Sequence, residues 1–227
     1  MKVRILRQSS PFSEPYWESF IYDGPDDNTV AGVLDYINYN DDIVNDNGEK
    51  TGRIGWECSC FQGLCGACAM VINGHPALAC NTFLRDLTGD EIEIRPLRKF
   101  PTVSDLVVDR TGITENLRKA EVYISEHEEY QADDYEHQYA ASKCLKCGLC
   151  LEVCPNYGRG EVFYGAAFAN DCYLVYSGDS RRKSDLKAEY DKQFAGHCSK
   201  SLSCMEVCPM EIPTIASMAK MNRRKIK

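Results

Sequence analysis

Residues 144–155 read Cys144-Leu-Lys-Cys147-Gly-Leu-Cys150-Leu-Glu-Val-Cys154-Pro155, a run with the spacing C-x2-C-x2-C-x3-C-P. Residues 198–209 follow the same template and read Cys198-Ser-Lys-Ser201-Leu-Ser-Cys204-Met-Glu-Val-Cys208-Pro209. The second run differs in carrying Ser201 where the template has its second cysteine. The shared ending Glu-Val-Cys-Pro indicates an internal repeat, so the chemistry of one run is expected to depend on the other.

A run of this spacing is typical of bacterial proteins that hold two iron–sulfur clusters, and its fourth cysteine ligates the other cluster. Crossing the ligands in this way predicts one site with four thiolates, from Cys144, Cys147, Cys150 and Cys208. The other site receives three thiolates, from Cys154, Cys198 and Cys204. The expected occupants are a four-iron (4Fe-4S) cluster and a three-iron (3Fe-4S) cluster that lacks one corner.

Ser201 is the reason for the missing corner. A serine hydroxyl is far harder to deprotonate than a thiol, whose pKa is about 8.5, so Ser201 is a poor iron ligand. The alternative is that the Ser201 oxygen ligates a fourth iron.

A third group of cysteines lies earlier in the chain, in Cys60-Phe-Gln-Gly-Leu-Cys65-Gly-Ala-Cys68, followed by Cys80. The C-x4-C-x2-C opening is the plant-type spacing for a 2Fe-2S cluster held by four thiolates. Gly63 and Gly66 permit backbone conformations that let main-chain N–H groups approach the sulfurs. A structural zinc ion is the alternative, because four thiolates also suit zinc, although zinc sites usually pair two short Cys-x2-4-Cys knuckles.

These three sites use 11 of the 13 cysteines and leave Cys58 and Cys172. Cys58 is interpreted as a spare thiol near the first site; the alternative is that the first ligand shifts by two residues, from Cys60 to Cys58. Cys172 is predicted to be a small, buried apolar residue.

The composition of the 227-residue chain excludes several classes of protein. Thirteen cysteines without an N-terminal export signal favour metal binding in a reducing compartment over disulfides. No apolar run approaches the roughly 20 residues that cross a bilayer, so we expect any membrane association to come through a partner. The net charge of -8 argues against a nucleic-acid-binding protein. An acidic stretch at 126–136 and a basic tail at 220–227 are interpreted as solvated surface, the alternative for the tail being contact with an anionic surface.

Short strands and one helix are predicted in the first hundred residues. Extended runs occur at 3–6 and 19–22, and helical apolar spacing links Val30, Val33, Leu34 and Ile37. Asn73-Gly74 lies between two extended runs and predicts a two-residue hairpin turn, while a last strand at 92–94 ends at Pro96.

Strand signals fade beyond residue 104, and helices are expected at 126–142 and 184–194. We therefore predict an α+β chain with one domain at 1–103 for the 2Fe-2S cluster and a mostly helical domain at 104–227 for the other two clusters.

The chain resembles the iron–sulfur subunit of succinate dehydrogenase and fumarate reductase over nearly its whole length. Beyond the cysteines, the resemblance rests on Arg95-Pro-Leu-Arg-Lys-Phe-Pro-Thr-Val-Ser-Asp-Leu-Val-Val-Asp109 and on Cys208-Pro-Met-Glu-Ile-Pro213. It implies an N-terminal plant-type ferredoxin-like (β-grasp) domain and a C-terminal, mostly helical domain of the bacterial-ferredoxin-like type.

The same resemblance implies electron transfer within an enzyme complex, with no catalytic residue on this chain. In the family, a flavoprotein subunit interconverts succinate and fumarate at FAD. Electrons pass through the 2Fe-2S, 4Fe-4S and 3Fe-4S clusters, in that order, to quinone at a membrane-anchor subunit of the cytochrome b type. The implied location is the cytoplasmic face of the bacterial inner membrane, where the membrane subunit would hold this chain peripherally.

Two stretches depart from family members that use ubiquinone. Those members have a tryptophan shortly after the first Cys-Pro and a histidine after the first cysteine of the last run. Here the stretches read Asn156-Tyr157-Gly158-Arg159 and Ser199, and both tryptophans, Trp17 and Trp56, lie in the N-terminal half. The departure favours a low-potential quinone such as menaquinone, or a different membrane partner, and with it a bacterial fumarate reductase.

Three aromatic residues after the first run are candidates to line a quinone site, with packing around the cluster as the alternative: Tyr157, Phe163 and Tyr164. For the whole chain, one alternative is the electron-transfer subunit of another flavoprotein reductase or oxidase. Another is a zinc-stabilised interaction module.

Overall fold

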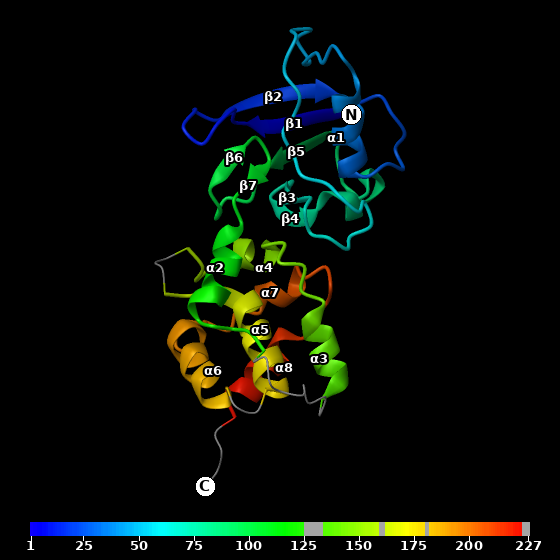
Figure 1. Ribbon diagram of the computed structural model, residues 1–227. Coiled ribbons are helices and arrows are strands. Elements are labelled where there is room, and N and C mark those ends of the chain that lie inside the picture. Colours follow the sequence, from blue (N-terminus) through cyan, green and yellow to red (C-terminus); the bar gives the residue numbers. More distant parts are fainter. Residues whose placement is uncertain (125–133, 159–161, 180–181, 224–227) are drawn as a thin grey trace. The chain divides into compact units, whose positions relative to one another are not determined.

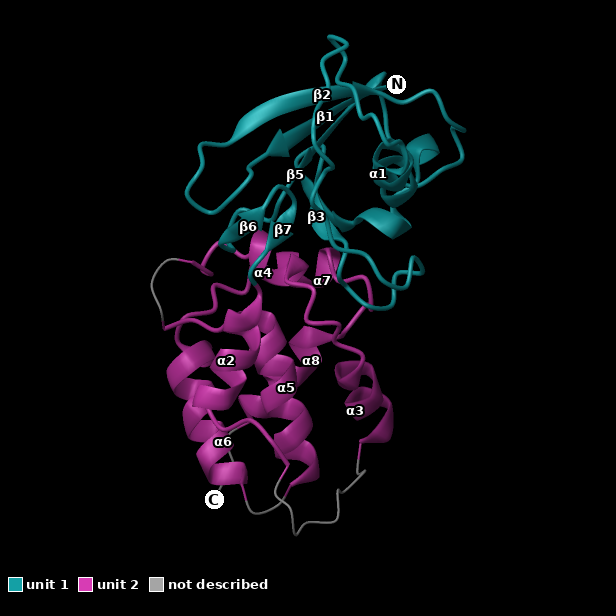
Figure 2. Cartoon of the chain, turned by 45° about the horizontal axis from the view of Figure 1, so that its top comes forward, with its two compact units in different colours: residues 1–109 teal, residues 110–227 magenta. Residues whose placement is uncertain are grey.

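The computed structural model describes residues 1–124, 134–158, 162–179 and 182–223 (Figure 1). The chain divides into two compact units, residues 1–109 and 110–227 (Figure 2). The first unit is thus slightly longer than the domain of residues 1–103 that the sequence predicts.

Unit 1 is built on a mixed five-stranded sheet with the strand order β2-β1-β5-β3-β4. The strands are β1 (Lys2–Arg7), β2 (Tyr16–Ile21), β3 (Ala69–Ile72), β4 (His75–Leu78) and β5 (Glu91–Arg95). β1 and β5 pair in parallel, with Lys2 opposite Glu91, and the other neighbours are antiparallel. This sheet and the helix α1 confirm the predicted α+β fold of the N-terminal half.

The predicted helix forms as α1 (Val30–Tyr39). It begins after Thr29, whose hydroxyl accepts a hydrogen bond of 3.2 Å from the backbone N–H of Gly32 and so caps the helix. The apolar residues at helical spacing are all buried: Val30, Val33, Leu34 and Ile37. Burial of this stripe stabilises the helix more than its own propensity does.

The Asn73-Gly74 hairpin is confirmed, and it positions the first group of cysteines. Asn73 and Gly74 have φ values of 46° and 80°, the left-handed conformations that a tight turn between β3 and β4 requires. The chain then makes two short 3-10 turns, η1 (Ala79–Asn81) and η2 (Leu84–Asp86). The hairpin returns the chain to its starting end, so η1 lies next to the residues that precede β3.

A small hairpin that the sequence does not predict closes unit 1. It consists of β6 (Thr102–Ser104) and β7 (Val107–Val108). At its turn, the buried carboxylate of Asp105 accepts hydrogen bonds from the backbone N–H groups of Gln8 (2.9 Å) and Gly55 (2.8 Å) and pairs with Arg7 at 3.0 Å. These bonds tie the hairpin to β1, which is why the unit extends to residue 109.

Every secondary-structure element of unit 2 within its described residues is a helix or a helical turn. Its elements are α2 (Thr111–Lys119), α3 (Tyr135–Ser142), α4 (Leu149–Val153), α5 (Gly165–Gly178), α6 (Lys183–Tyr190), the π-type turn η3 (Asp191–Ala195), α7 (Ser203–Glu206) and α8 (Thr214–Met221). The mostly helical character predicted for the C-terminal half is confirmed.

The helix α5 is the centre of unit 2 and contacts α2, α3, α4, α6 and α8. Ten of its 14 residues are buried, on all sides of the helix. Around it lies one apolar core that includes Phe163, Phe168, Tyr173, Phe194 and Met218. Cys172 is fully buried in this core, as the sequence predicts.

Two regions predicted from sequence fall partly outside the described residues. Of the helix expected at 126–142, residues 134–142 are described and contain α3; the acidic residues up to 133 lie outside. Of the basic tail, Lys220 and Arg223 are described, and residues 224–227 lie outside. No helix within the described ranges is both long and apolar enough to span a membrane.

Candidate metal centres

The first group of cysteines is gathered by the loop before β3 and by η1 after β4. Cys68 and Cys80 are buried, and their sulfurs lie 3.3 Å apart, because the β3–β4 hairpin brings the two residues to the same end of the sheet. Cys60 and Cys65 lie in the loop and are half-buried. Cys58 is exposed, just outside this group.

Backbone N–H groups of the loop point at these sulfurs. Gln62 and Leu64 each donate to Cys60 Sγ at 3.3 Å, and Gly63 donates to Cys80 Sγ at 3.2 Å. The left-handed φ values of Gly63 (71°) and Gly66 (77°) curl the loop so that its amides face inward. The hydrogen bonds from Gln62 and Leu64 lower the pKa of Cys60 to about 7, so the loop is already arranged to stabilise a thiolate.

A thiolate at the buried Cys68 would require a neighbouring cation. Burial raises the pKa of Cys68 to about 12, since a thiolate in an apolar site loses its hydration. Bound metal ions deprotonate coordinating thiols outright and supply the missing positive charge. Four sulfur donors, inward amides and partial burial together fit the 2Fe-2S cluster predicted for this loop.

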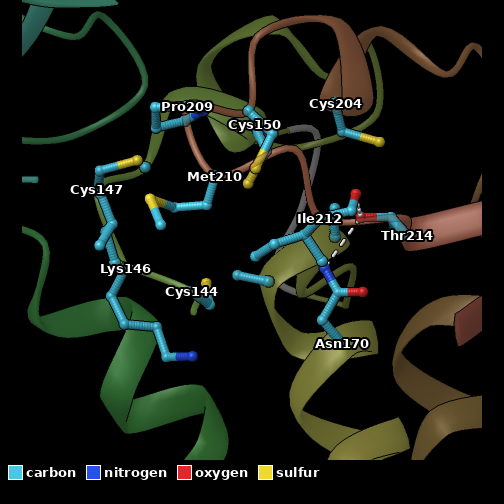
Figure 3. Close-up of a pocket in the computed structure, with 15 residues that line it drawn as sticks. Cys144, Lys146, Cys147, Cys150, Asn170, Cys204, Pro209, Met210, Ile212 and Thr214 are labelled. Atoms are coloured by element: carbon cyan, nitrogen blue, oxygen red, sulfur yellow. Dashed lines mark hydrogen bonds between the residues drawn. The ribbon is translucent and has the colours of Figure 1, made fainter. Parts of the chain in front are cut away.

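In unit 2, cysteines of both runs line a single pocket. Figure 3 shows Cys144, Cys147 and Cys150 of the first run around it, with Cys204 and Pro209 of the second run and the adjoining Met210 facing them. Cys208 completes the cysteines of the lining. Burial raises the pKa of Cys147 to about 11, and burial together with the neighbouring cysteines raises the pKa of Cys150 well above its ordinary value. Several buried cysteines around one pocket are difficult to ionise without a cation. They therefore fit a metal cluster, as the cysteines in the loop of unit 1 do.

A second pocket in unit 2 is lined by Cys154, Cys198 and Cys204, together with Ser201. Cys154, from the end of the first run, thus lies with the second run, while Cys208, from the end of the second run, lies with the first. The Ser201 hydroxyl accepts a hydrogen bond of 3.4 Å from Ser203. Cys204 lines both pockets, so the sequence-based assignment of individual ligands stays a prediction.

The aromatic residues named as quinone candidates are engaged in packing. Phe163 stacks on Phe194 with ring centroids 5.3 Å apart, and Tyr164 meets Phe168 edge to face at 5.1 Å. Tyr157 is half-buried beside the same core. Phe163 and Phe194 also line the second pocket, so these two rings form part of the apolar wall of that site.

One charged pair beside the first pocket was not found by sequence reasoning. Lys146, between Cys144 and Cys147, forms an ion pair of 2.6 Å with Asp171 of α5. The sequence offered one signal, because the repeat carries a lysine at the same position of each run, but nothing local points to Asp171.

Family comparisons match both halves of the chain. The 2Fe-2S iron-sulfur cluster binding domain family matches residues 2–115, and the 4Fe-4S dicluster domain family matches residues 140–212. Iron–sulfur chemistry is therefore shown for both units, and the zinc alternative is set aside.

Comparisons with individual proteins extend over the whole chain. It is 35% identical to the succinate dehydrogenase iron-sulfur subunit of Bacillus subtilis, across 96% of this chain and 90% of that protein. It is 32% identical to a fumarate reductase iron-sulfur subunit of Escherichia coli, with the same shares covered. A chain of the Mycobacterium smegmatis Sdh1 complex superposes with a TM-score of 0.74 at 24% identity, covering 100% of this chain and 97% of that one. The last comparison supports the fold.

Proposed function

Because the chain belongs to the family of iron–sulfur subunits of succinate dehydrogenase and fumarate reductase, we propose that it conducts electrons between an FAD-containing flavoprotein subunit and membrane quinone. The chain is a subunit of an enzyme complex and is itself non-catalytic: the succinate and fumarate chemistry belongs to the flavoprotein.

The observation that carries this proposal is the exchange of cysteines between the two pockets of unit 2. We assign the 4Fe-4S cluster to Cys144, Cys147, Cys150 and Cys208, and the 3Fe-4S cluster to Cys154, Cys198 and Cys204. The 2Fe-2S cluster is assigned to Cys60, Cys65, Cys68 and Cys80 of unit 1. When bound, the clusters accept and release single electrons.

The chain's own residues hold and insulate these sites. Thiolates fix the metal, backbone amides of the unit 1 loop donate to sulfur, and apolar side chains such as Phe163 and Phe194 keep water from the second pocket of unit 2. Hydrogen bonding and solvent exposure are the means by which a protein sets the potential of such a cluster.

The proposed partners are the flavoprotein, a membrane-anchor subunit of the cytochrome b type, and a quinone. Asn156-Tyr157-Gly158-Arg159 and Ser199 replace the tryptophan and histidine of ubiquinone-using members, which supports menaquinone. Attachment through the anchor places the chain peripherally at the cytoplasmic face of the bacterial inner membrane.

Purification of the tagged chain from its own membranes tests this proposal. Mass spectrometry is expected to identify a flavoprotein and a membrane subunit, and the copurified complex is expected to oxidise succinate or reduce fumarate. A flavoprotein partner that does neither would assign the chain to another reductase or oxidase. Extraction of the lipid phase identifies the quinone.

A further inference from the structure

Lys146 occupies an unusual position within the first cysteine run. It lies between two of the assigned ligands of the 4Fe-4S cluster, has a left-handed φ of 55°, and lines the same pocket as Cys144 and Cys147 (Figure 3). A long cationic side chain beside a metal-binding loop normally extends into water. The side chain of Lys146 is instead partly buried, with an exposed fraction of 31%.

Asp171 holds the side chain in place. Lys146 Nζ lies 2.6 Å from Asp171 Oδ1, and the carboxylate is 13% exposed. The second carboxylate oxygen, Oδ2, is buried and has no hydrogen-bond partner within the residues that the structure describes. The negative charge of Asp171 is therefore balanced by Lys146, and separating the two would leave a buried carboxylate unpaired.

Lys146 is also the closer of the two charged residues to the assigned ligands. It lines the pocket and adjoins Cys147 in the chain, whereas Asp171 lies on α5 and does not belong to the pocket lining. Arg110 contacts the run elsewhere, at the carbonyl of Cys147.

Adding one electron to a cluster makes it more negative by one charge, with no bond made or broken. A fixed positive charge in a partly buried site favours the more negative state, and the local net charge is one of the factors that set cluster potentials. We propose that Lys146 raises the reduction potential of the 4Fe-4S cluster, and that Asp171 positions the ammonium group and limits the rise. The proposal rests on the cluster assignment given above.

The second run supplies an internal control. Lys200 has the corresponding sequence position and nearly the same φ, 58°, but it is exposed. Among the described residues, no ion pair is found for it. The ammonium of an exposed lysine is screened by water and salt, and Lys200 does not line the first pocket, so Lys200 should have little effect on the 4Fe-4S cluster.

Potentiometric titration of the purified complex, followed by electron paramagnetic resonance of the reduced 4Fe-4S cluster, tests the proposal. Lys146→Met is expected to shift the potential to more negative values, since the cation is lost and the buried Asp171 becomes neutral. Asp171→Asn is expected to shift it in the opposite direction, since the cation remains without its counter-charge. Lys146→Arg should stay close to the wild type, and Lys200→Met should leave the 4Fe-4S potential unchanged.

Opposite shifts distinguish electrostatic tuning from a merely structural role, in which both variants would loosen the loop and alter the cluster in the same way. Shifts of equal sign, or no shift in Asp171→Asn, overturn the proposal. If Lys146→Met fails to assemble, Asp171→Asn and Lys146→Arg still decide. Failure of the cluster assignment is recognised separately, because the wild-type complex would then lack the 4Fe-4S signal.

Discussion

The two cysteine runs of unit 2 have similar backbone conformations but differ in their burial and in their packing contacts. In each run a lysine with left-handed φ, Lys146 or Lys200, is followed two residues later by a second left-handed residue. That residue is Gly148 (φ 89°) before α4 and Leu202 (φ 63°) before α7. The repeat in sequence is therefore a repeat in conformation.

The surroundings of the runs are unequal. The first run includes buried residues such as Cys147, Leu149 and Leu151, whereas no residue of the second run, from Cys198 to Pro209, is buried. The first run packs on α5 so closely that a methyl group added to Gly165 would lie 2.2 Å from Leu151 Cδ2. The comparison shows that the spacing of the repeat sets the backbone conformation of both runs. The residues that pack against each run are not repeated, and they set the environment of its site.

The largest expected effect comes from making the second run like the first. Ser201→Cys supplies the missing fourth thiolate and should convert the 3Fe-4S cluster into a 4Fe-4S cluster with a lower potential, adding one iron per chain. Electron paramagnetic resonance of the oxidised complex measures this as loss of the three-iron signal. Ser203→Cys, at a neighbouring position outside the template, is the matched control and should retain the signal. Persistence of the signal in Ser201→Cys contradicts the ligand pairing.

The reverse substitution makes the first run like the second. Cys147→Ser removes one of the four assigned thiolates from the buried pocket, and a serine hydroxyl is a poor replacement. The variant should lose one iron per chain and its 4Fe-4S signal. Cys172→Ser is the control, because Cys172 is buried in the core and outside both pockets; its iron content should equal that of the wild type. An unchanged 4Fe-4S signal in Cys147→Ser would remove Cys147 from the ligand set.

The rates of iron removal from the two sites of unit 2 should differ, because the residues of the two runs differ in burial. In the isolated subunit, a chelator is expected to reach the second pocket through the second run, which has no buried residue, and to empty that pocket several-fold faster than the pocket of the first run, because access through the covering side chains limits the reaction. Loss of the three-iron and four-iron signals over time gives the two rates. Equal rates would mean that the clusters are released by a shared opening of unit 2 rather than by local exposure.

The smallest expected effect concerns the left-handed residues before α4 and α7. Gly148→Leu introduces a side chain at a φ of 89° and should destabilise the first run by about 1–2 kcal/mol, whereas Leu202→Gly should relieve strain of similar size in the second. The urea concentration at which cluster absorbance disappears reports both changes. The same direction of change in both variants would show that packing at these positions outweighs backbone strain.

Local features of the fold were predictable from sequence. Asn73-Gly74 favours a tight turn through its own backbone preferences, and the apolar stripe of residues 30–37 defines the buried face of α1 within a single helix. These signals lie in a few adjacent residues, and the structure confirms both.

Features that depend on distant residues were missed. The β6–β7 hairpin is held by Asp105 through Gln8 and Gly55, so its own short strands carry little signal. The helix α5 was not predicted because it is buried on all sides and lacks the polar face that gives a helix its periodicity. The parallel pairing of β1 with β5 joins residues at opposite ends of unit 1.

In the candidate sites, too, local features were predictable and features that depend on distant residues were not. The spacing of the cysteines was sufficient to predict which chain segments gather, since a metal cluster imposes short, fixed separations on its ligands. The charge environment was not predictable, because Asp171 approaches Lys146 only after α5 has packed on the first run. The tuning that we propose for Lys146 and Asp171 therefore depends on tertiary structure, whereas the proposed ligands follow from spacing in the sequence.

The pocket shared by Cys144, Cys147, Cys150 and Cys208 has a consequence for biosynthesis. The first three cysteines leave the ribosome about 60 residues before the fourth. At roughly 5–20 residues per second, they are exposed for several seconds as a half-built site. Neither run can close its pocket alone, so stable cluster insertion must await nearly complete synthesis of unit 2. A truncation within the second run would therefore abolish both clusters of unit 2, whereas the sheet and the cysteine loop of unit 1 have already been synthesised.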